Sequence, residues 1–111
     1  MNISAQQRDA ITILYLEGRI DGEGALELDK ALQGVLADGH VRLVLDMSQV
    51  SYINSAGLRT LADALSQAQQ RQGDVKLVTL SPKVLRVLQI IGFDRFFDMH
   101  ASLPEALAAF G

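Results

Sequence analysis

Several residue types that would define a function are missing from this sequence. There is no cysteine among the 111 residues, so disulfide bonds and thiol chemistry are excluded and a reducing compartment fits. No apolar run approaches the roughly 20 residues that a membrane-spanning helix needs. The N-terminal segment MNISAQQRD is polar and too short for a signal peptide. We therefore expect a cytoplasmic protein with no membrane partner.

Clusters of basic residues are also missing. The formal net charge is −3 and the isoelectric point is near 5.2. Binding to nucleic acid phosphates needs clustered lysine and arginine, so we expect no nucleic acid partner. Hydrophobic residues make up 49% of the chain, which is enough for a real core. The length is that of one domain, and we expect it to span residues 1–111.

The stretch Val41–Leu61 organises the rest of the chain. It opens with an apolar run to Leu45, which is typical of a strand buried on both faces, and Asp46 ends that run. Polar residues from Ser48 to Ser51 then predict a segment that crosses the edge of the sheet. The sequence N-S-A-G, Asn54 to Gly57, begins a helix with apolar residues at helical spacing.

Ser55 has two interpretations at this position. It can be the N-cap of the helix, since a serine oxygen often accepts a hydrogen bond from an N–H of the first turn. It can instead present a hydroxyl that carries phosphate, at a helix end where unpaired N–H groups and the helix dipole favour negative charge. The chemistry of the residue alone favours the cap.

The remaining segments alternate between strands and helices. Strands followed by helices of 12 or more residues imply right-handed crossovers and a mainly parallel sheet. The order β-β-α-β-α-β-α-β-α therefore predicts one α/β layer domain with about four helices. The expected elements, besides the central stretch, are an edge strand from Ile3, a strand Ile11–Glu17, helices Ala25–Leu36 and Ala56–Gln72, a strand Val75–Leu80, a helix from Pro82 capped by Ser81, a strand Phe96–Phe97 and a helix after Ser102.

The helical spacing also predicts which side chains are buried. Leu26 falls off the apolar stripe of the first helix and is expected at the surface. In the second helix we expect Leu58, Leu61, Ala62, Leu65 and Ala68 inside, with Arg59, Thr60 and Asp63 outside. In the third helix we expect Val84, Val87, Leu88 and Ile91 inside, and Phe93, Phe96 and Phe97 to supply most of the aromatic core.

Residues arranged for catalysis or metal binding are not found. His40 and His100 are far apart and fit no metal-ligand spacing, and no G-x-S-x-G surrounds Ser55. Asp46 could be a metal ligand or a base, but bonds to backbone N–H groups are favoured. Gly22-Glu23-Gly24 lacks the further residues of a phosphate loop and predicts a turn. We therefore expect that the protein is not an enzyme and that it binds no metal and no cofactor.

The segment D-M-S-Q-V-S-Y-I-N-S-A-G-L, Asp46 to Leu58, resembles the signature of the STAS domain of bacterial anti-sigma factor antagonists. The G-R-I-D segment, Gly18 to Asp21, resembles the same family where the chain enters the first helix. The resemblance covers nearly the whole chain and implies the STAS fold, with a mainly parallel sheet and an antiparallel edge strand. The family commonly has Asp where this chain has Asn54.

This resemblance implies a partner-switching function in bacterial signalling and transcription regulation. In the family, the serine that corresponds to Ser55 is phosphorylated by an anti-sigma factor that is also a serine kinase, and a metal-dependent serine phosphatase resets it. The unphosphorylated form binds the anti-sigma factor and frees the sigma factor. The partner-binding residues implied here are Asp21, Asn54, Ser55, Ala56, Gly57, Leu58 and Arg59. Asp21 could equally be no more than the cap of the first helix.

Other functions remain open on the same fold. STAS domains also occur as structural subunits of stress-sensing assemblies or of lipid-transport ABC systems, where no phosphoswitch is needed. A nucleotide-binding module is a further alternative, although no phosphate loop supports it. Binding of a partner that ignores Ser55 would favour the structural-subunit hypothesis.

Overall fold

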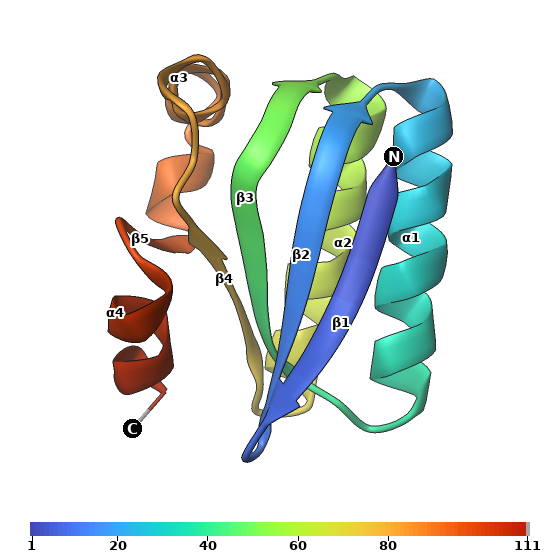
Figure 1. Cartoon of the computed structure of the whole chain (residues 1–111), viewed down its shortest axis with the longest axis vertical. Coiled ribbons are helices and arrows are strands. Elements are labelled where there is room, and N and C mark those ends of the chain that lie inside the picture. Colours follow the sequence, from blue (N-terminus) through green and yellow to red (C-terminus); the bar gives the residue numbers. More distant parts are fainter. Residues whose placement is uncertain (111) are drawn as a thin grey trace.

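Five strands form one mixed sheet in the order β1-β2-β3-β4-β5. The computed structural model describes residues 1–110, and Gly111, the last residue of the expected domain, lies outside the described residues. β1 is antiparallel to β2 and the other neighbouring strands are parallel (Figure 1). The elements are β1 Asn2–Arg8, β2 Ile11–Ile20, α1 Gly22–Ala37, β3 Arg42–Ile53, α2 Ser55–Gln70, β4 Asp74–Val78, α3 Pro82–Ile90, the 3₁₀ helix η1 Phe93–Arg95, β5 Asp98–His100 and α4 Leu103–Ala109. The expected α/β class, order of elements and antiparallel edge strand are confirmed.

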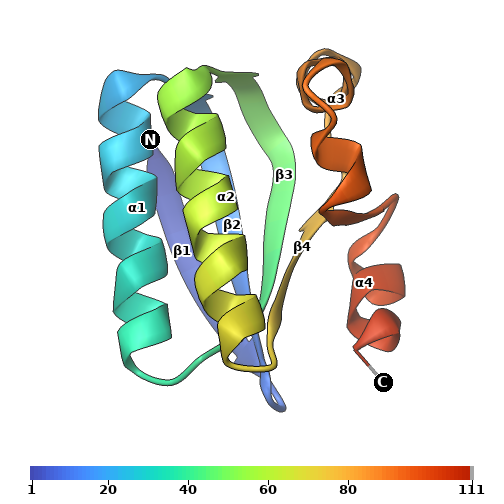
Figure 2. The same cartoon turned by 180° about the vertical axis from the view of Figure 1, so that it is seen from behind.

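Apolar side chains cover the two faces of the sheet unequally. The larger cluster joins Leu45 and Leu77 of the sheet to Leu32 of α1, Leu61 of α2 and Leu88 of α3. Figure 2 shows α1 and α2 side by side across this face. The smaller cluster, on the other face, joins Ile13, Val44 and Val78 to Ala106 of α4. On that face the front of β1 and β2 carries no helix (Figure 1).

β3 is longer than the sequence suggested, and the expected polar crossing at Ser48–Ser51 is wrong. Tyr15 of β2 pairs with Asp46, but Glu17 pairs with Gln49, so β3 holds an extra residue there. Such a β-bulge places two exposed residues in succession inside a continuous strand. The carboxylate of Asp46 accepts a hydrogen bond from the backbone N–H of Ser48 at 2.9 Å. The preferred interpretation of Asp46, as a partner for backbone N–H groups, is confirmed.

The C-terminal aromatic residues also differ from expectation. The expected strand at Phe96–Phe97 is wrong, because η1 turns the chain there and the strand follows at Asp98. The rings of Phe93 and Phe97 lie 5.8 Å apart between centroids, four positions apart along the chain. Phe97 is buried, whereas the side chain of Phe96, the residue before it, is 66% exposed. Only two of the three aromatic residues therefore contribute to the core.

The helix boundaries shift by one to three residues, and some of the buried faces differ from the expected ones. α2 begins at Ser55 and buries Thr60 and Ala64, while Leu58 and Ala62 are only half-buried. Thr60 can be buried because its hydroxyl donates to the backbone carbonyl of Ala56 at 3.0 Å. The expectation for Ile91 is wrong as well: α3 ends before it, and its side chain is 44% exposed. The exposure expected for Leu26 is confirmed.

Gly24 permits a close approach between α1 and the end of β2. The segment Gly22–Gly24 is the first turn of α1 and not a separate turn. A Cβ at Gly24 would overlap the carbonyl oxygen of Arg19, whereas a Cβ at Gly34 in the same helix would meet no atom within 4 Å. An added methyl group would therefore clash with the backbone at Gly24, whereas at Gly34 it would fit without a clash.

We predict that Gly24→Ala lowers the free energy of unfolding by about 1–3 kcal/mol, because the backbone of β2 must shift. Gly34→Ala is the control, and it should raise stability by about 0.5–1 kcal/mol through helix propensity. Urea unfolding followed by circular dichroism measures both. Equal stability of the two alanine variants would contradict the close approach.

A buried lysine joins β4 to the C-terminal elements. Lys76 is 6% exposed, and its Nζ lies 2.8 Å from Asp98 Oδ2 and 3.1 Å from Asp74 Oδ2. The same Nζ lies 4.6 Å from the centre of the Phe110 ring. Burial opposes the charge of Lys76, but hydrogen bonds and attraction from Asp98 and Asp74 outweigh it, so its pKa is raised. The hydrogen bond from Lys76 is the main reason that the pKa of Asp98 is lowered.

This ion pair predicts a loss of stability in acid. Because the pKa of Asp98 lies below its ordinary value of 3.8 in the folded protein, its contribution is complete above that pH. It is lost as the pH falls through 3.8 toward the lower folded-state pKa. Asp98→Asn should therefore flatten the decline in unfolding free energy between about pH 5 and pH 2. Asp94→Asn, on exposed η1, is the control; an unchanged slope in Asp98→Asn would refute the role of the pair.

Candidate functional site

Two helices begin next to each other at the carboxyl ends of β2 and β3. The Asp21 carboxylate caps α1 by accepting from the Gly24 N–H at 2.9 Å, and the Asn54 side chain caps α2 by accepting from the Gly57 N–H at 3.0 Å. The Asn54 backbone N–H also donates to the carbonyl of Ile20 at 3.0 Å. Each helix thus starts with the same capping arrangement, and this backbone bond fixes the two starts to one another.

Ser55 is the first residue of α2 and does not cap it. Asn54 takes that position, so the interpretation of Ser55 as the N-cap is wrong. The side chains of Ser81 and Ser102, by contrast, do cap α3 and α4. Ser55 is exposed, and within residues 1–110 its hydroxyl has no hydrogen-bond partner. The hydroxyl is therefore presented to solvent at a helix N-terminus, where backbone N–H groups and the dipole favour an anion.

The other residues implied as a partner surface divide into two groups. Arg59 is exposed, and Asp21, Asn54 and Ala56 are half-buried beside Ser55. Gly57 and Leu58 face inward instead. A Cβ at Gly57 would lie 2.9 Å from Ile53 Cγ1, and Leu58 packs against the larger apolar cluster. We therefore expect Gly57 and Leu58 to position the surface from below.

A groove between the first turns of the two helices extends from this site. Its volume is about 220 Å³. We call it the α1–α2 groove; its lining residues recur at the same helical spacing on both helices, Gly22, Ala25, Leu26 and Asp29 on α1 and Ala56, Arg59, Thr60 and Asp63 on α2. The sequence identified Leu26 as exposed but could not place it beside α2, because that depends on how the helices pack.

Arg19 and Tyr52 form a second feature that the sequence did not indicate. They are register partners at the ends of β2 and β3, and the Arg19 guanidinium carbon lies 4.3 Å from the centre of the Tyr52 ring. This is close enough for a cation–π interaction. The pairing depends on the irregular register of β3, so no local sequence signal reveals it. It ties together the strand ends that lead into Asp21 and Asn54.

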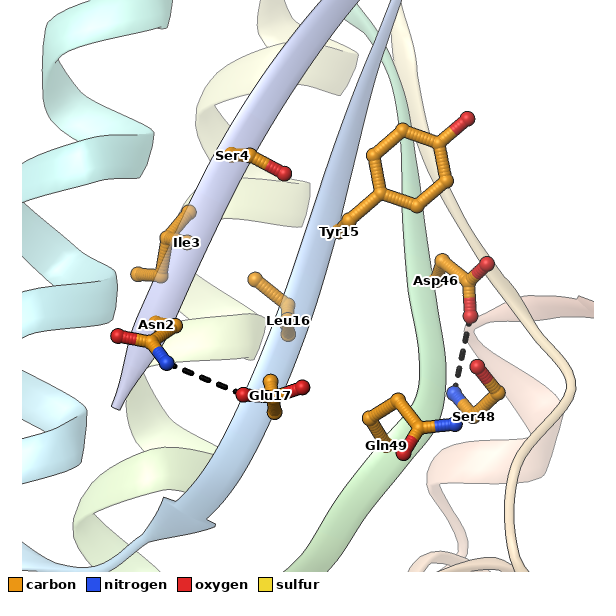
Figure 3. Close-up of a pocket in the computed structure, with 9 residues that line it drawn as sticks. All are labelled: Asn2, Ile3, Ser4, Tyr15, Leu16, Glu17, Asp46, Ser48 and Gln49. Atoms are coloured by element: carbon orange, nitrogen blue, oxygen red, sulfur yellow. Dashed lines mark hydrogen bonds between the residues drawn. The ribbon is translucent and has the colours of Figure 1, made fainter.

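A different depression lies on the open face of the sheet (Figure 3). It has a volume of about 270 Å³ and is lined by β1, β2 and the bulge of β3. Two hydrogen bonds lie within it: Asn2 donates to Glu17 at 3.0 Å and the Ser48 N–H donates to Asp46. Ser55 begins a helix on the opposite face of the sheet. Ser4 and Ser48 also line the depression, but both lie in strands, so neither hydroxyl is placed at a helix N-terminus as that of Ser55 is.

The two histidines lie in different parts of the fold, one after α1 and one in β5. His100 bonds the Asp98 carboxylate at 2.8 Å, and His40 follows the end of α1. Within residues 1–110, no three His, Cys, Asp or Glu side chains are grouped so as to hold a metal ion. None of the helices in that range is both long and apolar enough to cross a membrane.

Comparison with known proteins gives one consistent family. The family model described as the STAS domain matches residues 2–106. BtrV of Bordetella bronchiseptica, which is named as an anti-sigma factor antagonist, is 34% identical over 99% of this chain and 95% of its own length. The anti-sigma-F factor antagonist RsfB of Mycobacterium tuberculosis is 28% identical over 96% of this chain and 87% of its own length.

Solved structures agree with these sequence relatives. A Thermotoga maritima protein described as an anti-sigma factor antagonist superposes with a TM-score of 0.92 at 25% identity, covering 96% of this chain and 92% of its own. The phosphorylated form of the Bacillus cell fate determinant SpoIIAA has a TM-score of 0.78 at 16% identity, covering 99% of this chain and 100% of its own. At that identity the second similarity establishes the fold alone.

The capping geometry predicts that Asn54 and Ser55 differ in their contribution to stability. Asn54→Ala should lower the free energy of unfolding by about 1 kcal/mol, because the Gly57 N–H loses its partner. Asn54→Asp keeps the oxygen and should keep the stability. Ser55→Ala should change it by less than about 0.5 kcal/mol, as for an exposed side chain. Chemical denaturation measures all three, and a larger loss in Ser55→Ala than in Asn54→Ala would restore Ser55 as the cap.

Proposed function

The chain belongs to the STAS domain family of anti-sigma factor antagonists, and from this premise we propose that its single domain, residues 1–111, is a binding protein controlled by phosphorylation. The unphosphorylated form binds an anti-sigma factor that is also a serine kinase, and the sigma factor is thereby freed. The kinase phosphorylates Ser55, which ends the binding, and a metal-dependent serine phosphatase reverses it. The contact surface comprises Asp21, Asn54, Ser55, Ala56 and Arg59, positioned by Gly57 and Leu58.

The proposal rests on the different roles of two adjacent residues, Asn54 and Ser55. Asn54 caps α2, and Ser55 presents its hydroxyl without being needed for the cap. A phosphate on Ser55 adds about −1.5 to −2 charges. At an exposed helix N-terminus such charge is favourable by roughly 0.3–1 kcal/mol. Phosphorylation at this position therefore leaves the fold intact and acts on the surface that a partner meets.

The surroundings of Ser55 suggest how the phosphate reduces binding. The bulk of the phosphate stands out from the surface, and its strongly hydrated charge has to lose water on contact with a partner. The Asp21 carboxylate, held near by the bond between Asn54 and Ile20, adds repulsion on the same side. A combined loss of about 3 kcal/mol at the interface weakens binding by more than a hundredfold.

A second function on the same fold is a structural STAS subunit of a stress-sensing assembly or of a lipid-transport ABC system. Asn54 favours it mildly, since the family commonly has an acidic residue before the phosphorylated serine. The amide still performs the capping role, because its oxygen accepts from the Gly57 N–H. The two functions differ in whether binding responds to charge at Ser55.

Calorimetric binding to each purified anti-sigma factor of the source bacterium, in the presence of ADP, tests the proposal. We expect Ser55→Ala to bind like the unmodified protein and Ser55→Asp to bind at least a hundredfold more weakly. Ser66→Asp, which adds the same charge at an exposed position of α2 remote from its start, is the control and should bind normally.

Unfolding curves of the same variants show whether a loss of binding reflects a loss of fold. Ser55→Asp should be at least as stable as Ser55→Ala, because the added charge faces the helix dipole. Equal binding of Ser55→Asp and Ser55→Ala to a partner would refute the switch and favour the structural-subunit function.

A further inference from the structure

Leu26 is an exposed apolar side chain that the fold does not require. It is 73% exposed on α1, where its neighbours Ala25 and Leu28 are buried. A single exposed leucine is ordinary on a protein surface. Leu26 is distinguished by its place, because it forms one lip of the α1–α2 groove, which starts beside Ser55. A contiguous apolar patch with a polar rim is typical of an interaction surface, and the groove lining joins Leu26 to Ala25 and Ala56 and includes Asp29, Arg59 and Asp63.

The size of the groove limits what it can hold. At about 220 Å³ it is smaller than the roughly 300–1,000 Å³ of pockets that enclose cofactors or drug-sized ligands. Its walls are the exposed Leu26 on one side and Ala56 with Thr60 on the other. A side chain inserted from a partner would bury these apolar atoms without displacing either helix, so the groove suits one apolar side chain.

The charged residues that line the groove indicate which kind of partner residue would lie beside the inserted apolar side chain. Asp29 on α1 and Asp63 on α2 line it further along, and Arg59 is the one cationic residue in its lining. Within the lining residues the carboxylates thus outnumber the guanidinium. Complementary charge on a partner favours specific association. A basic residue next to the inserted apolar side chain would meet this requirement.

We propose that the α1–α2 groove receives an apolar side chain of the anti-sigma factor, flanked by a basic residue that faces Asp29 and Asp63, and that Leu26 determines which anti-sigma factor is bound. This inference rests on the proposed function and names the contact that gives it specificity. Asp63 follows Ser55 by eight residues, or about 12 Å of helix at 1.5 Å per residue. That spacing exceeds the Debye length of about 8 Å at physiological salt. The Ser55 phosphate therefore acts at one end of the interface. At the other end, Asp29 and Asp63 bind the basic residue of the partner.

The test compares two substitutions that are matched in exposure. Leu26→Ser removes the groove lip, and Ile90→Ser removes an equally exposed apolar side chain, 72% against 73%, from α3. The probes are the purified anti-sigma factors of the source bacterium, measured by calorimetry with unphosphorylated protein. We expect Leu26→Ser to raise the Kd about tenfold or more, as for a buried leucine at an interface. Ile90→Ser should leave the Kd within about twofold.

The possible outcomes separate this inference from the function on which it rests. If Ser55→Asp abolishes binding and Leu26→Ser does not weaken it, the groove proposal is overturned and the switch stands. If none of these anti-sigma factors binds the unmodified protein, the proposed function fails and the groove proposal with it. Sedimentation equilibrium adds a further check: self-association lost in Leu26→Ser, with anti-sigma binding unchanged, assigns the groove to a second copy of the chain and overturns the proposal.

Discussion

The hydrogen bond from the Asn54 backbone N–H to the Ile20 carbonyl is the contact on which the site depends. It joins the end of β2 to the residue that starts α2, so α1 and α2 begin at one level and run next to each other (Figure 2). Because both helices are capped in the same way, by Asp21 and Asn54, neither helix needs the Ser55 hydroxyl. The groove and the presented hydroxyl are both consequences of this arrangement.

The bulged register of β3 is what brings Asn54 to that position. Relative to β2, β3 gains a residue between Asp46 and Gln49 and another between Val50 and Tyr52. A shift of one residue alone would turn every following side chain to the opposite face of the sheet. With two shifts, Ile20 and Ile53 remain paired and both are buried. The Asp46 carboxylate, bonded to the Ser48 N–H, supports the first of these shifts.

Much of this fold could be predicted from the sequence, because strand and helix periodicities and the caps at Ser81 and Ser102 are local signals. The errors come from features that depend on tertiary contacts. Ser48 and Gln49 looked like a loop because a bulge exposes two polar residues in succession. Asn54 and Ser55 are both good capping residues, and only the backbone geometry decides between them. Leu26 could be predicted as exposed, but its position beside Arg59 and Asp63 required the packing of two helices.

Asn54 and the Gly57 N–H form the cap of α2, and the Ser55 hydroxyl takes no part in it. In the proposed function this hydroxyl is the group that the kinase phosphorylates. Mass spectrometry of the protein purified from its own cells, under several growth and stress conditions, tests this most directly. The account predicts phosphate on Ser55 and an anti-sigma factor that co-purifies only with the unmodified form. A protein that never carries phosphate on Ser55, yet co-purifies with a transporter ATPase or a larger STAS assembly, would contradict it.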